Sequence, residues 1–296
     1  MPLPISVIIL TFNEEKNLPD CLSALDGLAE QVVVVDSGST DRTLEIARNW
    51  GAEIVEHPFQ YYSQQRNWAL DNLPLRCEWT LQLDADHRVT PELQKTLREI
   101  FSPLPPTGIN GYMVSRRTMF LDKWIRYGGH YPVYHAVLFR RSAGRCEDKL
   151  YDQHFVVQGE VRKLRGDIID IITDSLTTFT ERHNRWASLE ALDQSQTTIH
   201  ADSRRIQAKI GGTPMEKRRF LKSVYERLPL FVRPFLYFFI RYFLRLGFLD
   251  GRRGLIFHFL QGFWFRFLVD AKIFELRYQN MSRHKPNKHE NGSRQI

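Results

Sequence analysis

Two aspartates one residue apart, Asp84 and Asp86, end a hydrophobic run in the stretch TLQLDADHRV at residues 80–89. On an extended backbone, residues i and i+2 point to the same side, so the two carboxylates should converge. Two close carboxylates raise each other's pKa unless a cation lies near them. Oxygen ligands of this kind suit Mg²⁺ or Mn²⁺, which proteins usually hold with one or two carboxylates and substrate phosphates. The spacing predicts a divalent-metal site; the alternative is that Asp86 caps the helix that begins near Pro91.

A third carboxylate, Asp36, ends the apolar run QVVVVD at residues 31–36. The residues after it, SGSTD, are typical of a tight turn followed by a helix cap, and we interpret Ser39 and Asp41 as ordinary capping residues. Asp36 can only accept hydrogen bonds, so it could bind the imide N–H of a uracil or a ribose hydroxyl. The loop after the first apolar run, TFNEEKN, has no GxGxxG, which argues against a dinucleotide-binding dehydrogenase.

The elements that must position these carboxylates alternate between strand and helix patterns. Short apolar runs predict strands at residues 5–10, 31–36, 52–57 and 79–84, and helical spacing predicts helices at 14–25, 39–51, 62–73 and 90–101. Strands that are apolar on both faces and alternate with helices indicate a parallel sheet covered on both sides. Ligands of such sheets bind beyond the carboxyl ends of the strands. Asp36, Asp84 and Asp86 all lie at those ends.

The pattern changes after Pro106. Further strands are predicted at residues 111–121, 134–141 and 156–173, in an extension of mixed strand direction, followed by a polar amphipathic helix over 176–210. The polar tail at residues 281–296 is predicted to be disordered.

Composition and charge narrow the class of protein. Of the 296 residues, 43% are hydrophobic and 25% charged, which is typical of a globular chain. Residues 201–296 carry 20 Lys and Arg against 7 Asp and Glu, whereas residues 1–200 carry 21 against 27. The basic part should therefore meet an anionic surface, either a membrane or nucleic acid. Three cysteines without a CxxC pair, and a start without a basic segment, favour a reduced cytoplasmic setting and no signal peptide.

Four motifs together resemble a known family. The stretches ISVIILTFNEEKNL, VVVVDSGSTDRT, QQRNWAL and LQLDADHRV occur in the order and spacing of the family 2 glycosyltransferases. A later stretch, WIRYGGHYPVYHAVLFRR followed by RCEDKL, resembles the subgroup that adds sugars to lipopolysaccharide core or other bacterial surface glycans. The resemblance covers roughly residues 5–175. It implies an α/β, GT-A-like fold, with a mostly parallel sheet flanked by helices.

The resemblance also implies an activity and its site residues. The reaction would be an inverting transfer from a nucleotide-diphosphate sugar, expected to be a UDP-sugar, with Mg²⁺ or Mn²⁺ as cofactor. At the nucleotide and donor sugar the resemblance places Thr11, Asn13, Glu15, Asp36, Arg66, Asn67 and Asp84. Asp86, together with Asp84, would hold the metal. The catalytic base would come from CEDKL, where we favour Glu147 and keep Asp148 as the second candidate.

Several positions depart from the family pattern or stay open. His87 stands where an acidic residue is common; we expect it to be exposed, and the alternative is that it joins the metal shell. Cys146 stands where a histidine is expected. Arg116 and Arg117 are candidate phosphate partners, although such a pair more often faces solvent.

The basic C-terminal part is rich in aromatic residues. The segments around residues 228–278 predict a helical hairpin that lies in a membrane interface, with Arg233, Arg241 and Arg245 on one face at the headgroups. The alternative is a hairpin that packs on the catalytic domain or in a dimer. No apolar run is long enough for a clean transmembrane helix.

These observations predict a catalytic domain over residues 1–215, with a nucleotide-binding half at 1–105 and an acceptor and base half at 106–215, and a membrane-associating segment at 216–280. The expected acceptor is a glycolipid or lipid-linked glycan, and the expected place is the cytoplasmic side of the bacterial inner membrane. The alternatives are a sugar nucleotidyltransferase and a non-catalytic basic protein that binds membranes or nucleic acid. Nucleic acid is the less favoured partner, because it leaves the clustered aspartates unexplained.

Overall fold

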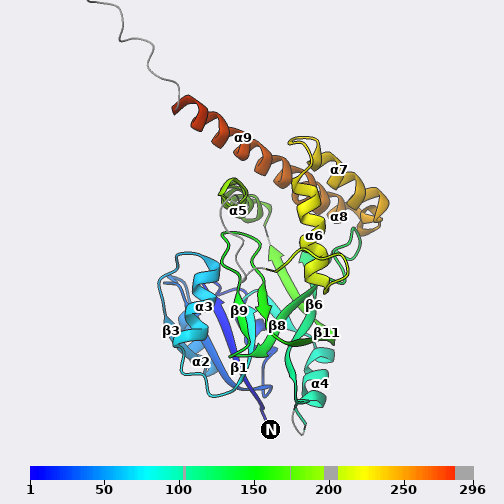
Figure 1. The fold of residues 1–296 in the computed structure, drawn as a ribbon. Coiled ribbons are helices and arrows are strands. Elements are labelled where there is room, and N and C mark those ends of the chain that lie inside the picture. The colour runs from blue at the N-terminus through cyan, green and yellow to red at the C-terminus, as the bar shows by residue number, and fades with distance from the viewer. Residues whose placement is uncertain (103–104, 174, 197–205, 284–296) are drawn as a thin grey trace, which may run out of the picture.

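The parallel half of the sheet carries the first candidate residues. In the computed structural model, which describes residues 1–102, 105–173, 175–196 and 206–283, one large sheet runs through the molecule (Figure 1). Its first four strands are β1 (Leu3–Thr11), β2 (Ala29–Asp36), β3 (Glu53–Glu56) and β4 (Trp79–Asp84). They pair in parallel in the order β3-β2-β1-β4, so Thr11, Asp36 and Asp84 all end strands on the same edge.

The second half of the sheet mixes strand directions, as the sequence predicts. It contains β5 (His87–Val89), β6 (Ile109–Phe120), β7 (Lys123–Trp124), β8 (Tyr134–Arg140) and β11 (Glu160–Thr173). Strand β8 is antiparallel to β4 and β6, β6 is parallel to β11, and β5 is antiparallel to β11. Beside this sheet, β9 (Gly144–Cys146) and β10 (Phe155–Val157) form a separate antiparallel pair.

Helices cover both faces of the parallel half because its strands are apolar on both sides. The helices are α1 (Leu18–Ser23), α2 (Thr43–Trp50), α3 (Tyr62–Asn72) and α4 (Pro91–Ile100). Helices α1, α2 and α4 share one core with Val7 and Ile9 of β1, whereas α3 packs on the other face with Ile8 of the same strand. Helix α4 begins where the sequence predicts, with the Thr90 side chain accepting a hydrogen bond from Leu93 N–H.

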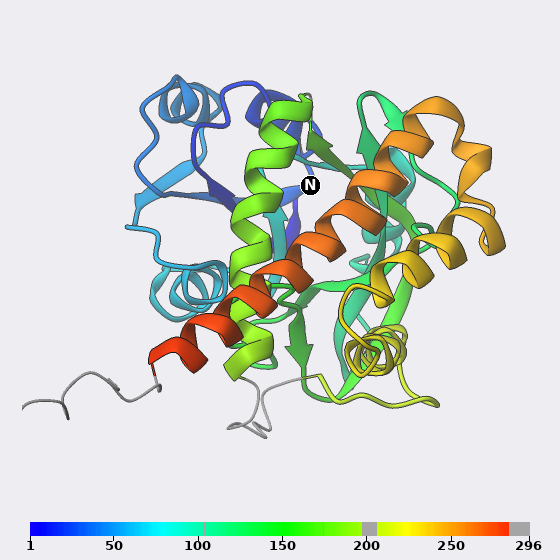
Figure 2. The ribbon, with the colours of Figure 1, turned by 90° about the horizontal axis from the view of Figure 1, so that it is seen from above.

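The C-terminal helices lie above the carboxyl ends of the strands (Figures 1 and 2). They are α5 (Leu176–Gln196), α6 (Pro214–Glu226), α7 (Arg233–Phe239), α8 (Gly251–Phe257) and α9 (Phe265–Arg283), with a π-helical turn after each of α7 and α8. Helices α5 and α9 cross and share a small core that includes Ala187, Ala191 and Val269. None of the described helices combines the length and apolar character that crossing a bilayer requires.

The predicted fold, a mostly parallel α/β sheet with flanking helices and a C-terminal helical hairpin, is confirmed. Some boundaries differ. The strand predicted over 156–173 is divided into β10 and β11 at Gly159, which has a positive φ of 90°. Helix α5 ends at Gln196, and residues 206–209 are not helical. Of the tail predicted at 281–296, residues 281–283 end α9 and the rest lies outside the described residues.

The hairpin corrects one prediction about its arginines. Arg233 does not face headgroups: its side chain is 2% exposed and pairs with the buried carboxylate of Asp270 on α9. Arg241 is half-buried against the ring of Tyr237, and only Arg245 is exposed. A buried guanidinium needs a carboxylate partner, and α9 supplies it.

Candidate active site

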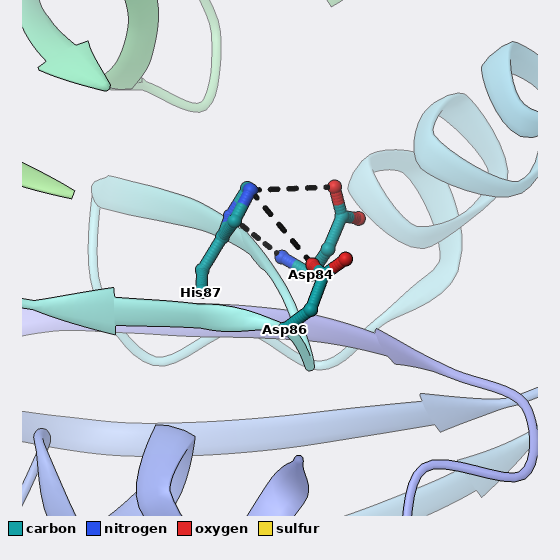
Figure 3. A group of neighbouring side chains, drawn as sticks. All are labelled: Asp84, Asp86 and His87. Atoms are coloured by element: carbon teal, nitrogen blue, oxygen red, sulfur yellow. Dashed lines mark hydrogen bonds and ion pairs between the residues drawn. The ribbon is translucent and has the colours of Figure 1, made fainter. Parts of the chain in front are cut away.

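Asp84, Asp86 and His87 form one cluster at the carboxyl edge of the sheet (Figure 3). Their potential ligand atoms all lie within 4.8 Å of one another. Asp84 ends β4, Asp86 lies in the turn that follows, and His87 begins β5. The carboxylates converge as predicted, but the cause is the tight reversal between β4 and β5, not a continuous extended strand.

His87 faces this pair and is buried, so the expectation of an exposed side chain is wrong. Its Nδ1 accepts a hydrogen bond from the Asp84 backbone N–H at 3.0 Å. Burial, with Arg116, lowers the pKa of His87 to about 4, so the ring is neutral and carries its one proton on Nε2. Nε2 lies 3.8 Å from Asp84 Oδ2 and 4.0 Å from Asp86 Oδ1. In this arrangement His87 presents an N–H to the carboxylates, and its ring is one of three groups placed within reach of a shared ion.

Arg66 holds the carboxylate of Asp84 in place. Its guanidinium, 1% exposed, donates to Asp84 Oδ1 and to the carbonyl of Leu83, the latter at 2.7 Å. Its Nε donates to the hydroxyl of Tyr62 at 3.1 Å, and that hydroxyl lies 3.3 Å from both carboxylate oxygens of Asp84. Burial alone would raise the pKa of Asp84, but Arg66, followed by His87, keeps it below its usual value. Asp84 is therefore ionised.

Asp86 has the opposite electrostatic environment. Burial, together with the charges of Asp170, Asp84 and Glu14, raises its pKa well above the usual value. Within the described residues, no Lys or Arg supplies a positive charge in contact with Asp86, although Arg182 acts on it from further away. A divalent cation would supply that charge, and two hard carboxylates are a suitable ligand set for Mg²⁺ or Mn²⁺. The residues present fit the predicted metal.

The loops after β1 and β2 are tied together by other predicted residues. Asp36 is fully buried and accepts hydrogen bonds from Thr11 Oγ1 at 2.8 Å, Gly38 N–H at 2.8 Å and Ser39 N–H at 2.7 Å. The Ser39 hydroxyl also donates to Asp36, at 2.6 Å. These bonds fix the turn after β2, and a contact between Asp36 and a nucleotide stays a prediction.

Asn13 and Glu15 hold the facing loop and are exposed at the same edge. Asn13, at a positive φ of 55°, accepts a hydrogen bond from Thr40 N–H at 2.8 Å through its side-chain oxygen. Glu15 accepts from Arg42 N–H at 3.2 Å. Both side chains are exposed at the sheet edge that carries Asp84, so a ligand can reach them.

Asn67 positions the other half of the site. Its side-chain amide donates to the Cys146 carbonyl at 3.0 Å, and its oxygen accepts from Cys146 N–H at 2.9 Å. Because Arg66 and Asn67 are neighbours on α3, one helix orients both Asp84 and the loop that begins at Cys146.

The two base candidates on that loop differ in access. Glu147 is fully buried and accepts hydrogen bonds from Arg219 at 2.7 Å, Ile206 N–H at 2.8 Å and His154 N–H at 3.0 Å. Asp148 is exposed. Of these two carboxylates, Glu147 is a structural anchor and Asp148 is the one that another molecule can reach.

Sequence reasoning missed two partners of the site. Asp170 on β11 lies opposite His87 across the β5–β11 pairing, and Arg116 lies 3.6 Å from it. Arg219 on α6 anchors Glu147. Neither contact has a local signal in the sequence, because each joins segments that only the fold brings together.

Comparisons with known proteins find similarity to glycosyltransferases. Residues 6–147 match the family model described as glycosyl transferase family 2. The chain is 29% identical over 288 residues to the lipopolysaccharide core biosynthesis glycosyltransferase LpsC of Rhizobium meliloti, covering 92% of this chain and 93% of that protein. An uncharacterized glycosyltransferase of Rickettsia bellii is 36% identical over 98 residues, which is 33% of each chain.

A solved structure is similar over a smaller share of the chain. Glucosyl-3-phosphoglycerate synthase from Mycobacterium tuberculosis, solved with Mn²⁺, UDP and phosphoglyceric acid, matches with a TM-score of 0.32 and 24% identity. The match covers 39% of this chain and 43% of that one.

Proposed function

Because residues 6–147 match the glycosyl transferase family 2 model, we propose that the protein transfers a sugar, with inversion, from a nucleotide-diphosphate donor to a glycolipid or lipid-linked acceptor. The proposed donor is a UDP-sugar, the proposed ion Mg²⁺ or Mn²⁺, and the proposed pathway the synthesis of bacterial lipopolysaccharide or surface polysaccharide. The observation that carries the proposal is the Asp84–Asp86–His87 cluster at the carboxyl edge of the sheet.

Each residue of the cluster has a task in donor cleavage. Departure of the nucleoside diphosphate builds negative charge on its phosphates, and a divalent ion bound there neutralises that charge. Asp84 and Asp86 supply the oxygen ligands, Arg66 keeps Asp84 ionised and oriented, and the Nε2–H of His87 faces both carboxylates. Thr11, Asn13, Glu15, Asp36 and Asn67 complete the proposed donor site, and Asn13 and Glu15 are its exposed members.

For the acceptor, we propose Asp148 as the general base in preference to Glu147. Asp148 takes the proton from the acceptor hydroxyl, whose oxygen then attacks the anomeric carbon on the face opposite the leaving diphosphate. Glu147 cannot reach an acceptor without giving up Arg219 and two backbone N–H groups. Its task is to hold the loop that presents Asp148.

The hairpin supports the proposed membrane location. Its exposed apolar side chains are Val232, Phe235, Leu236, Phe239, Phe243, Leu244, Leu246, Phe248, Leu249, Leu255, Ile256 and Phe259, here termed the apolar hairpin surface. Phe235 of α7 packs on Phe263 of the π-helical turn after α8, with ring centroids 4.6 Å apart, so the two arms of the hairpin are in contact. Many exposed apolar side chains on one such unit are typical of an interaction site.

Exposed charges beside that face favour a lipid bilayer as its partner. Arg252 and Arg253 are both exposed at the start of α8, which follows α7 and precedes α9 in the chain. Aromatic and aliphatic side chains rimmed by arginines suit the interface of an anionic bilayer. A peripheral position on the cytoplasmic face of the inner membrane would bring the catalytic edge close to a lipid-linked acceptor.

The experiment is a donor-turnover assay on the full-length protein. A panel of nucleotide sugars is offered with Mg²⁺, with Mn²⁺ and with a chelator, and release of the nucleoside diphosphate is measured. We expect turnover of one donor that needs the ion and that Asp86→Asn abolishes. Turnover that persists in the chelator would exclude the metal role. Release of pyrophosphate from a nucleoside triphosphate and a sugar phosphate would instead identify a nucleotidyltransferase.

A further inference from the structure

Three arginines from three separate elements act on one another electrostatically, and one of them, Arg116, also acts on Asp84 and His87. Arg116 lies on β6, Arg218 on α6, and Arg241 on the π-helical turn that follows α7. Burial, followed by the nearby charges of Arg116 and Arg241, lowers the pKa of Arg218, although Asp152 opposes this effect. Like charges brought together in a folded protein repel, so this arrangement needs a compensating partner.

Each of the three arginines has an N–H group without a hydrogen-bond partner. Arg116 Nε, Arg218 Nη1 and Arg241 Nε are shielded from solvent, and no described residue accepts from them. Native proteins seldom leave buried donors unpaired, because each one costs the desolvation energy of the group. Three such donors are therefore available to an acceptor that a bound molecule brings.

The carboxylates near this arginine cluster already have cationic partners, and one of them, Asp170, pairs with Arg116 itself. Asp152 pairs with Lys222 at 3.0 Å, and Glu147 pairs with Arg219 at 2.7 Å. Asp170 lies 3.6 Å from Arg116 and is that residue's ion-pair partner. Within the described ranges, neither Arg218 nor Arg241 has a carboxylate partner.

Neighbouring histidines orient the cluster but add no negative charge. Arg218 donates to Nε2 of His154 at 3.4 Å, and the Nδ1 of His154 lies 3.0 Å from the Asp152 carbonyl, to which it donates. Burial lowers the pKa of His154 to about 3, so its ring is neutral. His135 stacks on His154 with ring centroids 5.3 Å apart. The histidines therefore set the direction of the Arg218 side chain without compensating its charge.

We propose that Arg116, Arg218 and Arg241 bind an anionic group on the acceptor, a phosphate or a carboxylate carried by its sugar. The inference rests on the proposed glycosyl transfer and names the class of acceptor for that site. Arginine donors suit both oxyanions, which they bind with charge-assisted hydrogen bonds.

The position of Arg218 favours the acceptor over the donor diphosphate. Its neighbour Arg219 anchors Glu147 on the loop that presents Asp148, so an anion at Arg218 lies on the side of the proposed base. The donor phosphates are proposed to bind at Asp84 and Asp86. Arg116 lies between that site and the region of Arg218, since its charge acts on both Asp84 and His135.

The test is isothermal titration of the full-length protein, saturated with UDP and Mg²⁺, with three probes: D-glucose 6-phosphate, D-glucuronate and methyl D-glucoside. We expect one of the two anionic probes to bind and the neutral glycoside not to bind; which anion binds separates phosphate from carboxylate. Arg218→Gln should weaken that probe about tenfold or more, the loss expected for a charge-assisted hydrogen bond. Lys217→Gln, an exposed charge change on the same helix, should leave it unchanged.

Several results would overturn the assignment. An anionic probe that binds without UDP and Mg²⁺ but not in their presence would assign the arginines to the donor site. Equal binding by Arg218→Gln and the unaltered protein would exclude Arg218 from the site. If Arg218→Gln does not fold, Arg218→Lys is the second variant. It keeps the positive charge but loses the two parallel N–H donors of the guanidinium, so it should retain only part of the affinity for the probe. Asp86→Asn distinguishes the proposed donor site from the proposed anion site, because it should weaken Mg²⁺-dependent UDP binding while the anionic probe still binds.

Discussion

Arg219 of α6 donates a hydrogen bond to the fully buried carboxylate of Glu147, 2.7 Å away, and so ties a C-terminal helix to the loop that carries Asp148. Lys222, one turn further along α6, pairs with Asp152 of the same loop and with Glu190 of α5, each at 3.0 Å. Helices α5 and α6 therefore brace the loop that carries Asp148 through one set of ion pairs.

Substituting Glu147 and Asp148 one at a time should distinguish a structural role from a catalytic one. Glu147→Gln leaves the Arg219 charge without its buried partner, and should lower the free energy of unfolding by about 3 kcal/mol. Asp148→Asn removes an exposed carboxylate, and should change stability by less than about 0.5 kcal/mol while lowering kcat about 10²- to 10⁴-fold. Denaturant unfolding and donor turnover measure the two effects. A stable but inactive Glu147→Gln with an active Asp148→Asn would make Glu147 the base.

The contact between Arg66 and Asp84 predicts a metal-binding phenotype. Arg66→Met removes the cation that keeps Asp84 ionised, so the pKa of Asp84 should rise and Mn²⁺ should bind about tenfold or more weakly. Arg76→Met is the matched control, because Arg76 makes an exposed ion pair with Glu53, and such pairs contribute little. Mn²⁺ titration followed by electron paramagnetic resonance measures both. Unchanged Mn²⁺ affinity in Arg66→Met would show that Asp84 does not ligate the ion.

The raised pKa of Asp86 predicts opposite pH trends with and without metal. Metal-free folded protein binds a proton at Asp86 that the unfolded chain has already released, so its stability should fall as the pH rises from the usual carboxyl range through the raised pKa. Metal binding displaces that proton, so Mn²⁺ affinity should rise over the same interval. Thermal melts and Mn²⁺ titrations across this range test both slopes. Asp86→Asn should flatten both, and two flat profiles in the unaltered protein would contradict the assignment.

The sequence predicts the parallel half of the fold because its strands are short apolar runs between recognisable helices. Strand β5 could not be predicted, because it has only three residues, His87–Val89, and pairs with β11, which is far away in the sequence. That pairing also buries His87, which the sequence places in an exposed turn.

Side chains whose partners come from remote segments could not be predicted. A helical pattern gives the face on which Arg233 lies, but not that Asp270, 37 residues further along, will bury it. Arg66 lies beneath Asp84 for the same reason, since its contacts depend on how α3 packs on β4. Motif spacing identifies the cluster of Asp84 and Asp86, whereas the charges that tune it come from tertiary packing.

The apolar hairpin surface should control membrane binding, and point substitutions test it better than truncation. Truncation after residue 215 removes Arg219 and Lys222 together with the hairpin, and would disturb the base loop as well. Phe239→Ser with Phe243→Ser removes two rings that are 50% and 48% exposed, and each lost insertion should cost about 1–2 kcal/mol of membrane affinity. Flotation with vesicles that contain anionic lipid should therefore recover far less of this variant. Phe59→Ser, on a ring 53% exposed beside β3, should float like the unaltered protein. Equal flotation of both variants, or none by the unaltered protein, would leave the surface to a protein partner such as a second copy of the chain.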